Sequence, residues 1–243
     1  MVGRVTDVMT PLNLAVRNAA GLWSALGKAR GHDVVRGPGY LAVSGGQAGT
    51  RVLILTPTPS QEDVAAVVAL VGAAEKVVVE DAFNVVDMAP AGLRSRQLPV
   101  MIRDHGPALP APALPVKRIG VDQLELVENL VVHGFELENF QPYRAGEAFP
   151  PELLTRAEVG LYVIDREGEP AGACLTITDH GVTGIYWVTT APEHRSRGVG
   201  RQLMHAILAE AGDQPVTLTA ASAGKPLYDS LDFEVIGPST WWL

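Results

Sequence analysis

The first third of the chain alternates between helical and strand-like spacing of its hydrophobic residues. Apolar side chains recur at the spacing of a helical turn between Leu12 and Arg30, which predicts a helix. A second helix is predicted from Ser60, because Ser60-Gln-Glu-Asp63 has the pattern of a capping box. Short apolar runs bounded by turn residues predict strands at 40–43, 51–56 and 76–80. Residues 1–105 are therefore expected to form a small α/β unit.

Beyond residue 115 the pattern predicts more strand than helix. The expected strands lie at 116–119, 161–164, 171–178, 182–190, 216–220 and near 234–236. The expected helices lie at 122–133, 152–157, 198–211 and 225–231. This order predicts an α/β (α+β) fold class, with one mixed, mostly antiparallel sheet flanked by helices on both faces.

Between these two regions lies a proline-rich segment, Gly106 to Pro115, with four prolines in ten residues. Proline cannot continue a helix or donate to a central strand, so the segment is expected to be an extended, stiff linker. The predicted organisation is thus an α/β part over 1–105, a linker over 106–115 and a larger domain over 116–243.

Composition and charge exclude several classes of function. The 243-residue chain carries a formal net charge of -8, whereas nucleic-acid binders need clustered positive charge. No stretch has the length and hydrophobicity of a membrane span, so a cytoplasmic protein without membrane or nucleic-acid partners is expected. The single cysteine, Cys174, lies in an alternating apolar run and is expected to be a buried hydrophobic residue.

One segment has the features of an anion-binding turn. A predicted strand ends near Thr190, Pro192 turns the chain, and Arg195-x-x-Gly198-x-Gly200 leads into a helix. The first amides of a helix lack internal partners and lie at the positive end of its dipole, and glycine allows close approach of phosphates. Arg195, Arg197 and Arg201 add positive charge there. The alternative is a helix start that is rich in Gly and Arg by chance.

A second segment, Leu227-Tyr228-x-x-Leu231-x-Phe233, follows the next predicted strand. Leu227, Leu231 and Phe233 have the spacing of core residues. Tyr228 could be one more core residue, since a buried tyrosine usually finds a hydrogen-bond partner.

Together, these two motifs resemble the GNAT superfamily of acetyl-CoA-dependent N-acetyltransferases, over roughly Val116 to Leu243. The resemblance implies that acetyl-CoA is the co-substrate, with no metal and no covalent enzyme intermediate. It implies that the backbone of Val188, Thr189 and Thr190 pairs with the pantetheine arm. It also implies that amides of Ser196, Arg197, Gly198, Val199, Gly200 and Arg201 hold the pyrophosphate.

The chemistry that the resemblance implies is direct attack of an amine on the thioester. A backbone N–H near Val188 would stabilise the oxyanion, and Tyr228 would donate a proton to the departing thiolate. Asp232 stands where the family often has glycine, and Ser222 where asparagine is common. The strand at 216–220 lacks the glutamate that some relatives use as base. The general base is therefore unassigned, and Glu193, His180, Glu138 and His133 are candidates by residue type alone.

The leading hypothesis is an N-acetyltransferase that acts on a primary amine of a small molecule or a protein. The alternative is a non-catalytic module that binds acyl-CoA as a sensor. The acceptor is expected near Gly134 to Pro151, where Glu136, Glu138, Phe140 and Tyr143 lie together. The first part is a candidate for a degenerate copy of the same fold, since 40–56 can be laid over 161–178. The sequence does not indicate the oligomeric state.

Overall fold

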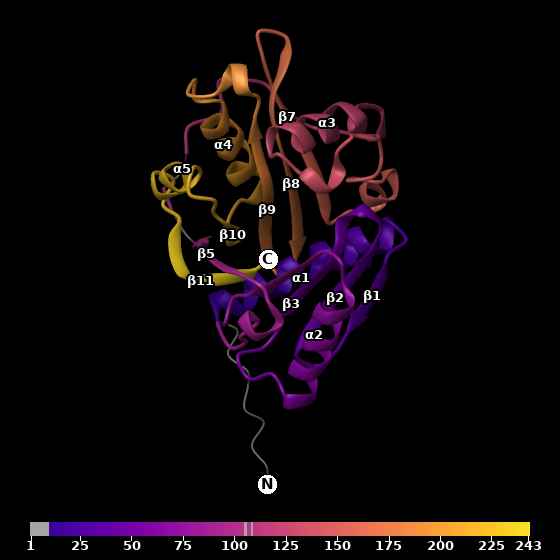
Figure 1. Ribbon diagram of the computed structural model, residues 1–243. Helices are drawn as coiled ribbons and strands as arrows, with labels where there is room; N and C mark the ends of the chain where they lie inside the picture. Colours follow the sequence, from indigo (N-terminus) through magenta and orange to yellow (C-terminus); the bar gives the residue numbers. More distant parts are fainter. Residues whose placement is uncertain (1–9, 105, 108) are drawn as a thin grey trace.

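The computed structural model describes residues 10–104, 106–107 and 109–243, and within them the strands form one continuous sheet (Figure 1). Its eleven strands run in the order β1-β2-β3-β4-β11-β5-β10-β9-β8-β7-β6. The predicted fold class, a mixed and mostly antiparallel sheet flanked by helices, is confirmed. Ala108, inside the predicted linker, and residues 1–9 and 105, inside the predicted first part, lie outside the described residues.

The α-helices of the described residues are α1 Pro11–Ala29, α2 Gln61–Ala73, α3 Leu124–Gly134, α4 Val199–Ala211 and α5 Lys225–Asp229. The strands of residues 10–104, called here the front half, are β1 Asp33–Arg36, β2 Tyr40–Gly45, β3 Gly49–Ile54, β4 Val77–Asp81 and β5 Ser95–Arg103. The strands of residues 116–243, the back half, are β6 Val116–Arg118, β7 Val159–Arg166, β8 Glu169–Asp179, β9 Val182–Thr190, β10 Val216–Thr219 and β11 Glu234–Trp242.

The helices cover both faces of the sheet. Alternate residues of a strand point to opposite faces. Leu161 and Val163 of β7 accordingly pack with α1 and α3, whereas Tyr162 and Ile164 pack with α4 and α5. In the front half the same alternation places α1 on one face and α2 on the other. Helix α1 therefore packs on strands of both halves, on the face that it shares with α3.

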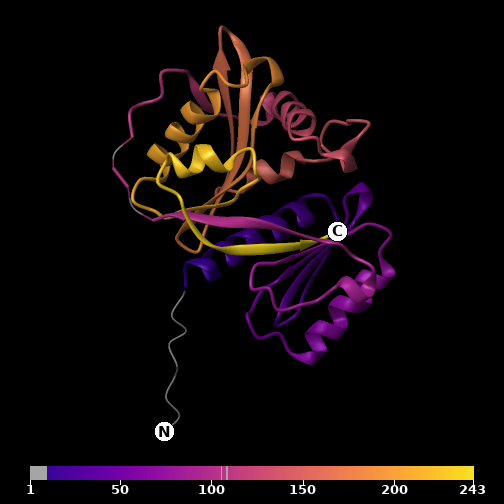
Figure 2. The same cartoon turned by 60° about the vertical axis from the view of Figure 1, so that its left-hand side comes forward.

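The two halves exchange strands at the centre of the sheet. Strand β5 belongs to the front half, yet it pairs antiparallel with β10 on one side and β11 on the other. Strand β11, from the back half, pairs in turn with β4 of the front half. Figure 2 shows β5 and β11 running side by side across the middle of the molecule. Each half thus completes its part of the sheet with a strand of the other.

The order of elements repeats along the chain. In the front half α1 precedes the antiparallel strands β1, β2 and β3, and after α2 strand β4 pairs parallel to β3. In the back half α3 precedes β7, β8 and β9, and after α4 strand β10 pairs parallel to β9. By sheet position β2 and β3 correspond to β8 and β9, so the overlay expected from the sequence is displaced by one strand. The division into two parts and a tandem origin stay predictions.

Several element boundaries differ from the sequence prediction. Strands β1 and β5 were not expected, β11 continues to Trp242, and Pro151–Thr155 is a 3-10 helix rather than an α-helix. The proline-rich linker also packs on the back half, because the amide of Ala113 donates to Oε1 of Gln202 on α4 at 2.6 Å. Leu109 and Leu114 contact the core beneath α4.

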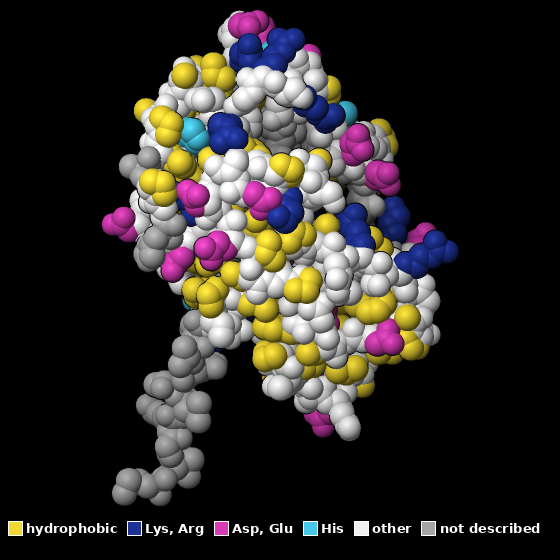
Figure 3. All heavy atoms as spheres, turned by 90° about the vertical axis from the view of Figure 1, so that its left-hand side faces the viewer, with side chains coloured by type: hydrophobic (Ala, Val, Ile, Leu, Met, Phe, Trp, Pro, Cys, Tyr) yellow, Lys and Arg dark blue, Asp and Glu magenta, His cyan; other side chains and the backbone are white. Residues whose placement is uncertain are grey.

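On the face that carries α4 and α5, acidic and basic side chains are interspersed rather than gathered in one patch (Figure 3). Among the described residues, every helix is too short or too polar to cross a membrane.

Candidate active site

Strands β9 and β10 separate after a short parallel contact. They pair only at Thr183 and Gly184 of β9, opposite Val216 and Thr217 of β10 respectively. Beyond Gly184, β9 continues to Thr190, and no described strand pairs with it on that side. The predicted pantetheine-binding residues Val188, Thr189 and Thr190 lie in this unpaired stretch, so backbone groups there can accept another extended chain.

A β-bulge interrupts β9 in the same stretch. Thr189 pairs with Ala173 and Tyr186 with Leu175, so that Trp187 and Val188 stand opposite the single residue Cys174. Trp187 has a φ of 51°, in the left-handed region. The bulge changes the direction of the backbone at Val188, whose N–H is the predicted donor to the oxyanion. Cys174 itself is buried and free, as expected for a small core residue.

The turn from β9 into α4 presents a run of free amides. The backbone N–H groups of six consecutive residues donate no hydrogen bond to any residue that the structure describes: Ser196, Arg197, Gly198, Val199, Gly200 and Arg201. The next amide, of Gln202, bonds the Gly198 carbonyl at 3.1 Å and begins the helical pattern. The partial positive charge of these donors makes the turn a suitable site for phosphates.

The two glycines of the turn differ in their surroundings. Gly198 caps α4 with a φ of 78°, and a Cβ there would meet no protein atom within 4 Å. The space beside it is open to an approaching group. A Cβ on Gly200 would lie 3.4 Å from Cδ2 of Leu227 and 3.5 Å from Oγ1 of Thr190. A Cβ there would be in ordinary van der Waals contact with both atoms, so Gly200 lies where the end of β9, the start of α4 and α5 meet.

Two of the three arginines of the turn bond oxygen atoms of the protein. The guanidinium of Arg195 donates to the carbonyls of Thr190 and Gly134, each at 3.3 Å, and so joins β9 to the end of α3. Arg201 donates to Oγ of Ser230 at 2.8 Å. Arg197 is exposed, and its carbonyl accepts from Arg166 of β7 at 3.2 Å. All three arginines are exposed, and the partners of Arg195 and Arg201 are neutral oxygens, so these two side chains keep their positive charge beside the turn. That the three arginines supply charge to a bound anion stays a prediction.

Tyr228 lies on the α4 side of the sheet, one residue after the Leu227 that contacts Gly200. It is 7% exposed, and its ring packs edge-on against Phe233 at 5.8 Å between centroids. No hydrogen bond of its hydroxyl is found among the described residues. Burial raises the pKa of the phenol, and nearby Cys174 raises it further. The absence of a core partner for the hydroxyl leaves it available to a ligand.

The four candidate bases are dispersed. His180 lies on the turn between β8 and β9, at the opposite end of β9 from Thr190, where it pairs with Asp179 at 3.6 Å. Glu193, Glu138 and His133 are exposed, and Nδ1 of His133 bonds the Asn129 carbonyl at 2.9 Å. No hydrogen bond or ring contact joins any of these four side chains to Tyr228 among the described residues, so the base stays unassigned.

The predicted acceptor segment is organised by a carboxylate that sequence analysis missed. Glu128 of α3 is fully buried and accepts hydrogen bonds from three backbone amides and a phenol: Gly146 (2.6 Å), Ala148 (2.7 Å), Phe149 (2.8 Å) and Tyr143 (3.1 Å). Arg30 at the end of α1 donates to the Ala148 carbonyl and lies 4.9 Å from the Phe140 ring. The front half therefore holds this segment in place. Its carboxylates Glu136 and Glu138 are exposed.

Comparison with known proteins agrees with this geometry. Residues 157–235 match the family model of the acetyltransferase (GNAT) domain. The fold is similar to that of a GCN5-related N-acetyltransferase from Kribbella flavida, with 16% identity over 92% of this chain and 94% of that chain, and a TM-score of 0.62. A GNAT-family protein from Novosphingobium aromaticivorans aligns with 17% identity over 96% and 97% of the two chains, at a TM-score of 0.64.

A third structure, a GCN5-related N-acetyltransferase from Sphaerobacter thermophilus, has 17% identity over 96% of this chain and 93% of that chain, with a TM-score of 0.53. These structures extend over both halves, so the strand-sharing sheet lies within a fold that such proteins adopt along nearly their whole length. No curated protein matches the sequence. The family match therefore covers residues 157–235, and over the rest of the chain the similarity to GNAT proteins is one of fold.

Proposed function

We propose that the protein is an acetyl-CoA-dependent N-acetyltransferase with one co-substrate site per chain, in the back half, and that it acts on a primary amine. The observation that carries this proposal is the run of six unbonded amides, Ser196 to Arg201, directly after the unpaired edge of β9. A phosphate-binding turn next to a free strand edge matches a ligand that has a pyrophosphate joined to an extended arm with amide groups.

The residues of the chain have separate tasks in this proposal. Acetyl-CoA supplies an acetyl group activated as a thioester. The amides of Ser196 to Arg201 bind its pyrophosphate, and the backbone of Val188 to Thr190 pairs with its pantetheine arm. The N–H of Val188, a residue of the bulge, stabilises negative charge on the thioester oxygen when the amine attacks.

Tyr228 completes the proposed chemistry as a proton donor to the departing sulfur. Because burial raises its pKa, the phenol is fully protonated at neutral pH. The same shift makes it a weaker acid than an exposed tyrosine. A coenzyme A thiol has a pKa near that of cysteine, about 8.5, so the thiolate needs only a hydrogen bond rather than complete proton transfer.

Calorimetric titration with acetyl-CoA tests the site. We expect a stoichiometry near one per chain, and loss of binding in Gly198→Leu, whose side chain would occupy the open space beside the turn. Gly212→Leu is the matched control, because Gly212 also has a positive φ, 62°, and open surroundings but lies at the other end of α4. Normal binding by Gly198→Leu would refute the pyrophosphate assignment.

A panel of amines assayed for release of free coenzyme A tests turnover. Activity should rise with pH, since only the neutral amine has a lone pair that can attack. Tight binding of acetyl-CoA without turnover on any amine would instead support a non-catalytic acyl-CoA sensor.

A further inference from the structure

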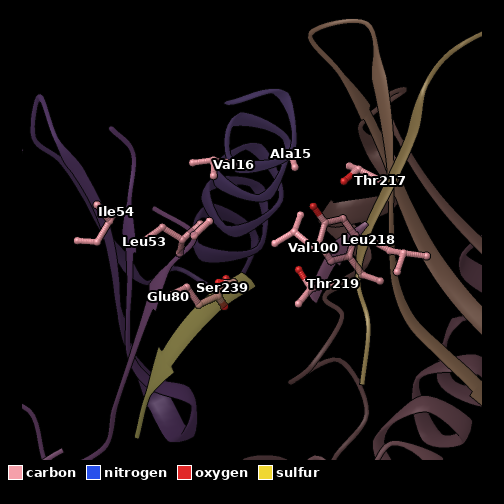
Figure 4. Close-up of a pocket in the computed structure, with 12 residues that line it drawn as sticks. Ala15, Val16, Leu53, Ile54, Glu80, Val100, Thr217, Leu218, Thr219 and Ser239 are labelled. Carbon is pink, nitrogen blue, oxygen red and sulfur yellow. The ribbon is translucent and has the colours of Figure 1, made fainter. Parts of the chain in front are cut away.

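A narrow cleft lies where the two halves meet, under the first turns of α1 (Figure 4). Its lining comes from α1, from the strands β3, β4, β5, β9, β10 and β11, and from Ala82, which directly follows β4. The space that a water-sized molecule can reach amounts to about 40 Å³.

The cleft approaches the candidate active site from the face opposite Tyr228. Tyr186 lines it from β9 and donates to Oδ1 of Asn18 on α1 at 2.7 Å, which places its ring on the α1 side of the sheet. Tyr186 precedes Val188, the predicted oxyanion donor, by two residues. Tyr228 packs with α4 on the other side. A molecule in the cleft can therefore reach the β9 edge without crossing the proposed site of acetyl-CoA.

Glu80 of β4 is the one carboxylate in the lining, and the lining has no lysine, arginine or histidine. One of its oxygens, Oε1, forms an ion pair with Arg51. No hydrogen bond or ion pair of the other oxygen, Oε2, is found among the described residues. Figure 4 shows Glu80 beside Ser239, across from Thr217 and Thr219.

Arg51 fixes the position of Glu80 and stays out of the cleft. Its guanidinium lies 4.0 Å from the ring centroid of Trp23 and 5.4 Å from that of Trp241. Trp241 is also the direct neighbour of Glu80 across the β4–β11 pair. Arg51 contacts these two aromatic rings and orients the carboxylate through the ion pair, so that the cleft meets a carboxylate oxygen rather than a guanidinium.

We propose that this cleft binds the acceptor, and that Glu80 binds a second cationic group of that acceptor, away from the reacting amine. This inference rests on the proposed N-acetyltransferase function. Four strand intervals separate β4 from β9, on the order of 19 Å in a flat sheet, which is too far for Glu80 to act on the reacting nitrogen itself. The acceptor class is thus an extended aliphatic diamine or oligoamine, and the front half contributes specificity.

A chain-length series of α,ω-diamines tests the proposal against monoamines of equal length, from the four-carbon to the twelve-carbon compounds. In the wild type, kcat/KM for diamines over monoamines should rise with length and reach a maximum when the second ammonium meets Glu80. Glu80→Gln keeps an oxygen for Arg51 and removes the charge. It should lower that preference by about ten- to a hundred-fold and abolish the maximum. Glu75→Gln, the same change at an exposed site in the front half, should leave both unchanged.

Binding is measured separately from turnover by the tryptophan fluorescence of the protein titrated with the best diamine and coenzyme A. Binding that Glu80→Gln weakens, with no acetyl transfer to any amine, would overturn the proposed function and support the cleft as a site. Acetyl transfer without diamine preference, or with a preference that Glu80→Gln leaves intact, would overturn the assignment of Glu80. Failure of every diamine to bind would also overturn it.

Discussion

Replacement of Glu128 by alanine should destabilise the protein more than replacement of any exposed carboxylate. Glu128 is fully buried on α3, and its two oxygens accept four hydrogen bonds from the segment that precedes β7. After truncation, Gly146 and Tyr143 can turn to solvent because both are only partly buried. The amides of Ala148 and Phe149 cannot, since these residues are 1% and 0% exposed.

The expected loss of stability follows from those two amides, which would be buried without a hydrogen-bond partner. An unsatisfied buried donor costs about 1–3 kcal/mol, and loss of one partner from a buried charged network costs about 3–5 kcal/mol in total. Arg30 adds to the cost: it is largely buried, burial lowers its pKa to about 10, and the charge of Glu128 opposes that shift. We therefore expect a loss of roughly 3–5 kcal/mol. For a chain of this size that corresponds to a fall in Tm on the order of 10 °C.

Thermal unfolding followed by circular dichroism measures this loss, with urea unfolding as a second determination. Glu125→Ala is the control, because Glu125 lies on the same helix with an exposed side chain. A Tm change in Glu128→Ala no larger than in the control would refute the reasoning. It would show that water or rearranged backbone replaces the carboxylate at little cost.

Three further predictions follow from the same geometry. Tyr228→Phe should lower kcat by about 10²-fold and leave the acetyl-CoA affinity unchanged. This effect is near the lower end of general-acid effects because the pKa of the phenol is raised. Equal loss of affinity and stability would show that Tyr228 is a core residue only. Residues 116–243 expressed alone should fail to unfold cooperatively in a urea titration, because β10 and β11 lose β5 between them; a folded, acetyl-CoA-binding fragment would contradict this. Burial raises the pKa of Tyr162, Cys174 and Tyr186, so the unfolded chain releases these protons at lower pH than the folded protein does. The free energy of unfolding should therefore fall as the pH rises above about 9. A urea midpoint that stays constant from pH 8 to 11 would contradict this prediction.

The sequence predicted the back half well because its strands carry regular apolar alternation and its turn carries a specific motif. Strand β5 escaped prediction for a physical reason. Its first residues, Ser95-Arg-Gln, are polar and exposed, and Pro99 lies at its centre. A proline within an apolar run argues against a central strand, yet here the run is central because β10 and β11 flank it. The pairing of β5 with β10 and β11, which joins the two halves, could therefore not be predicted from the local pattern of apolar residues.

The site was predicted in part for similar reasons. Free amides and glycine conformations depend on a few neighbouring residues, so the turn at Ser196 to Arg201 could be located from sequence. Glu128 and Glu80 act through partners far away in the chain. Glu128 contacts residues 143–149, and the cleft beside Glu80 contains residues from 15 to 239. No local spacing distinguishes such carboxylates from solvated ones.

The front half has a turn at the position that corresponds to the anion-binding turn, and its chemistry explains why one co-substrate site is expected. Between β3 and α2 the chain runs Leu55-Thr-Pro-Thr-Pro-Ser60, so two of its residues have no N–H to offer. The Asp63 carboxylate accepts from the amides of Ser60 and Gly39 and from the Ser60 hydroxyl, and the Asp63 amide donates to Oγ of Ser60. The hydrogen bond from that hydroxyl helps to hold the pKa of Asp63 below its usual range.

An internal anion therefore already occupies the start of α2, where the start of α4 leaves its amides free. A phosphate at α2 would have to displace a carboxylate that is covalently part of the chain and lies within its own capping box. The front half can thus keep the order of elements of the back half without keeping its ligand. In the proposed acceptor site, the front half contributes through α1, β4 and β5, which line the cleft on the face opposite Tyr228.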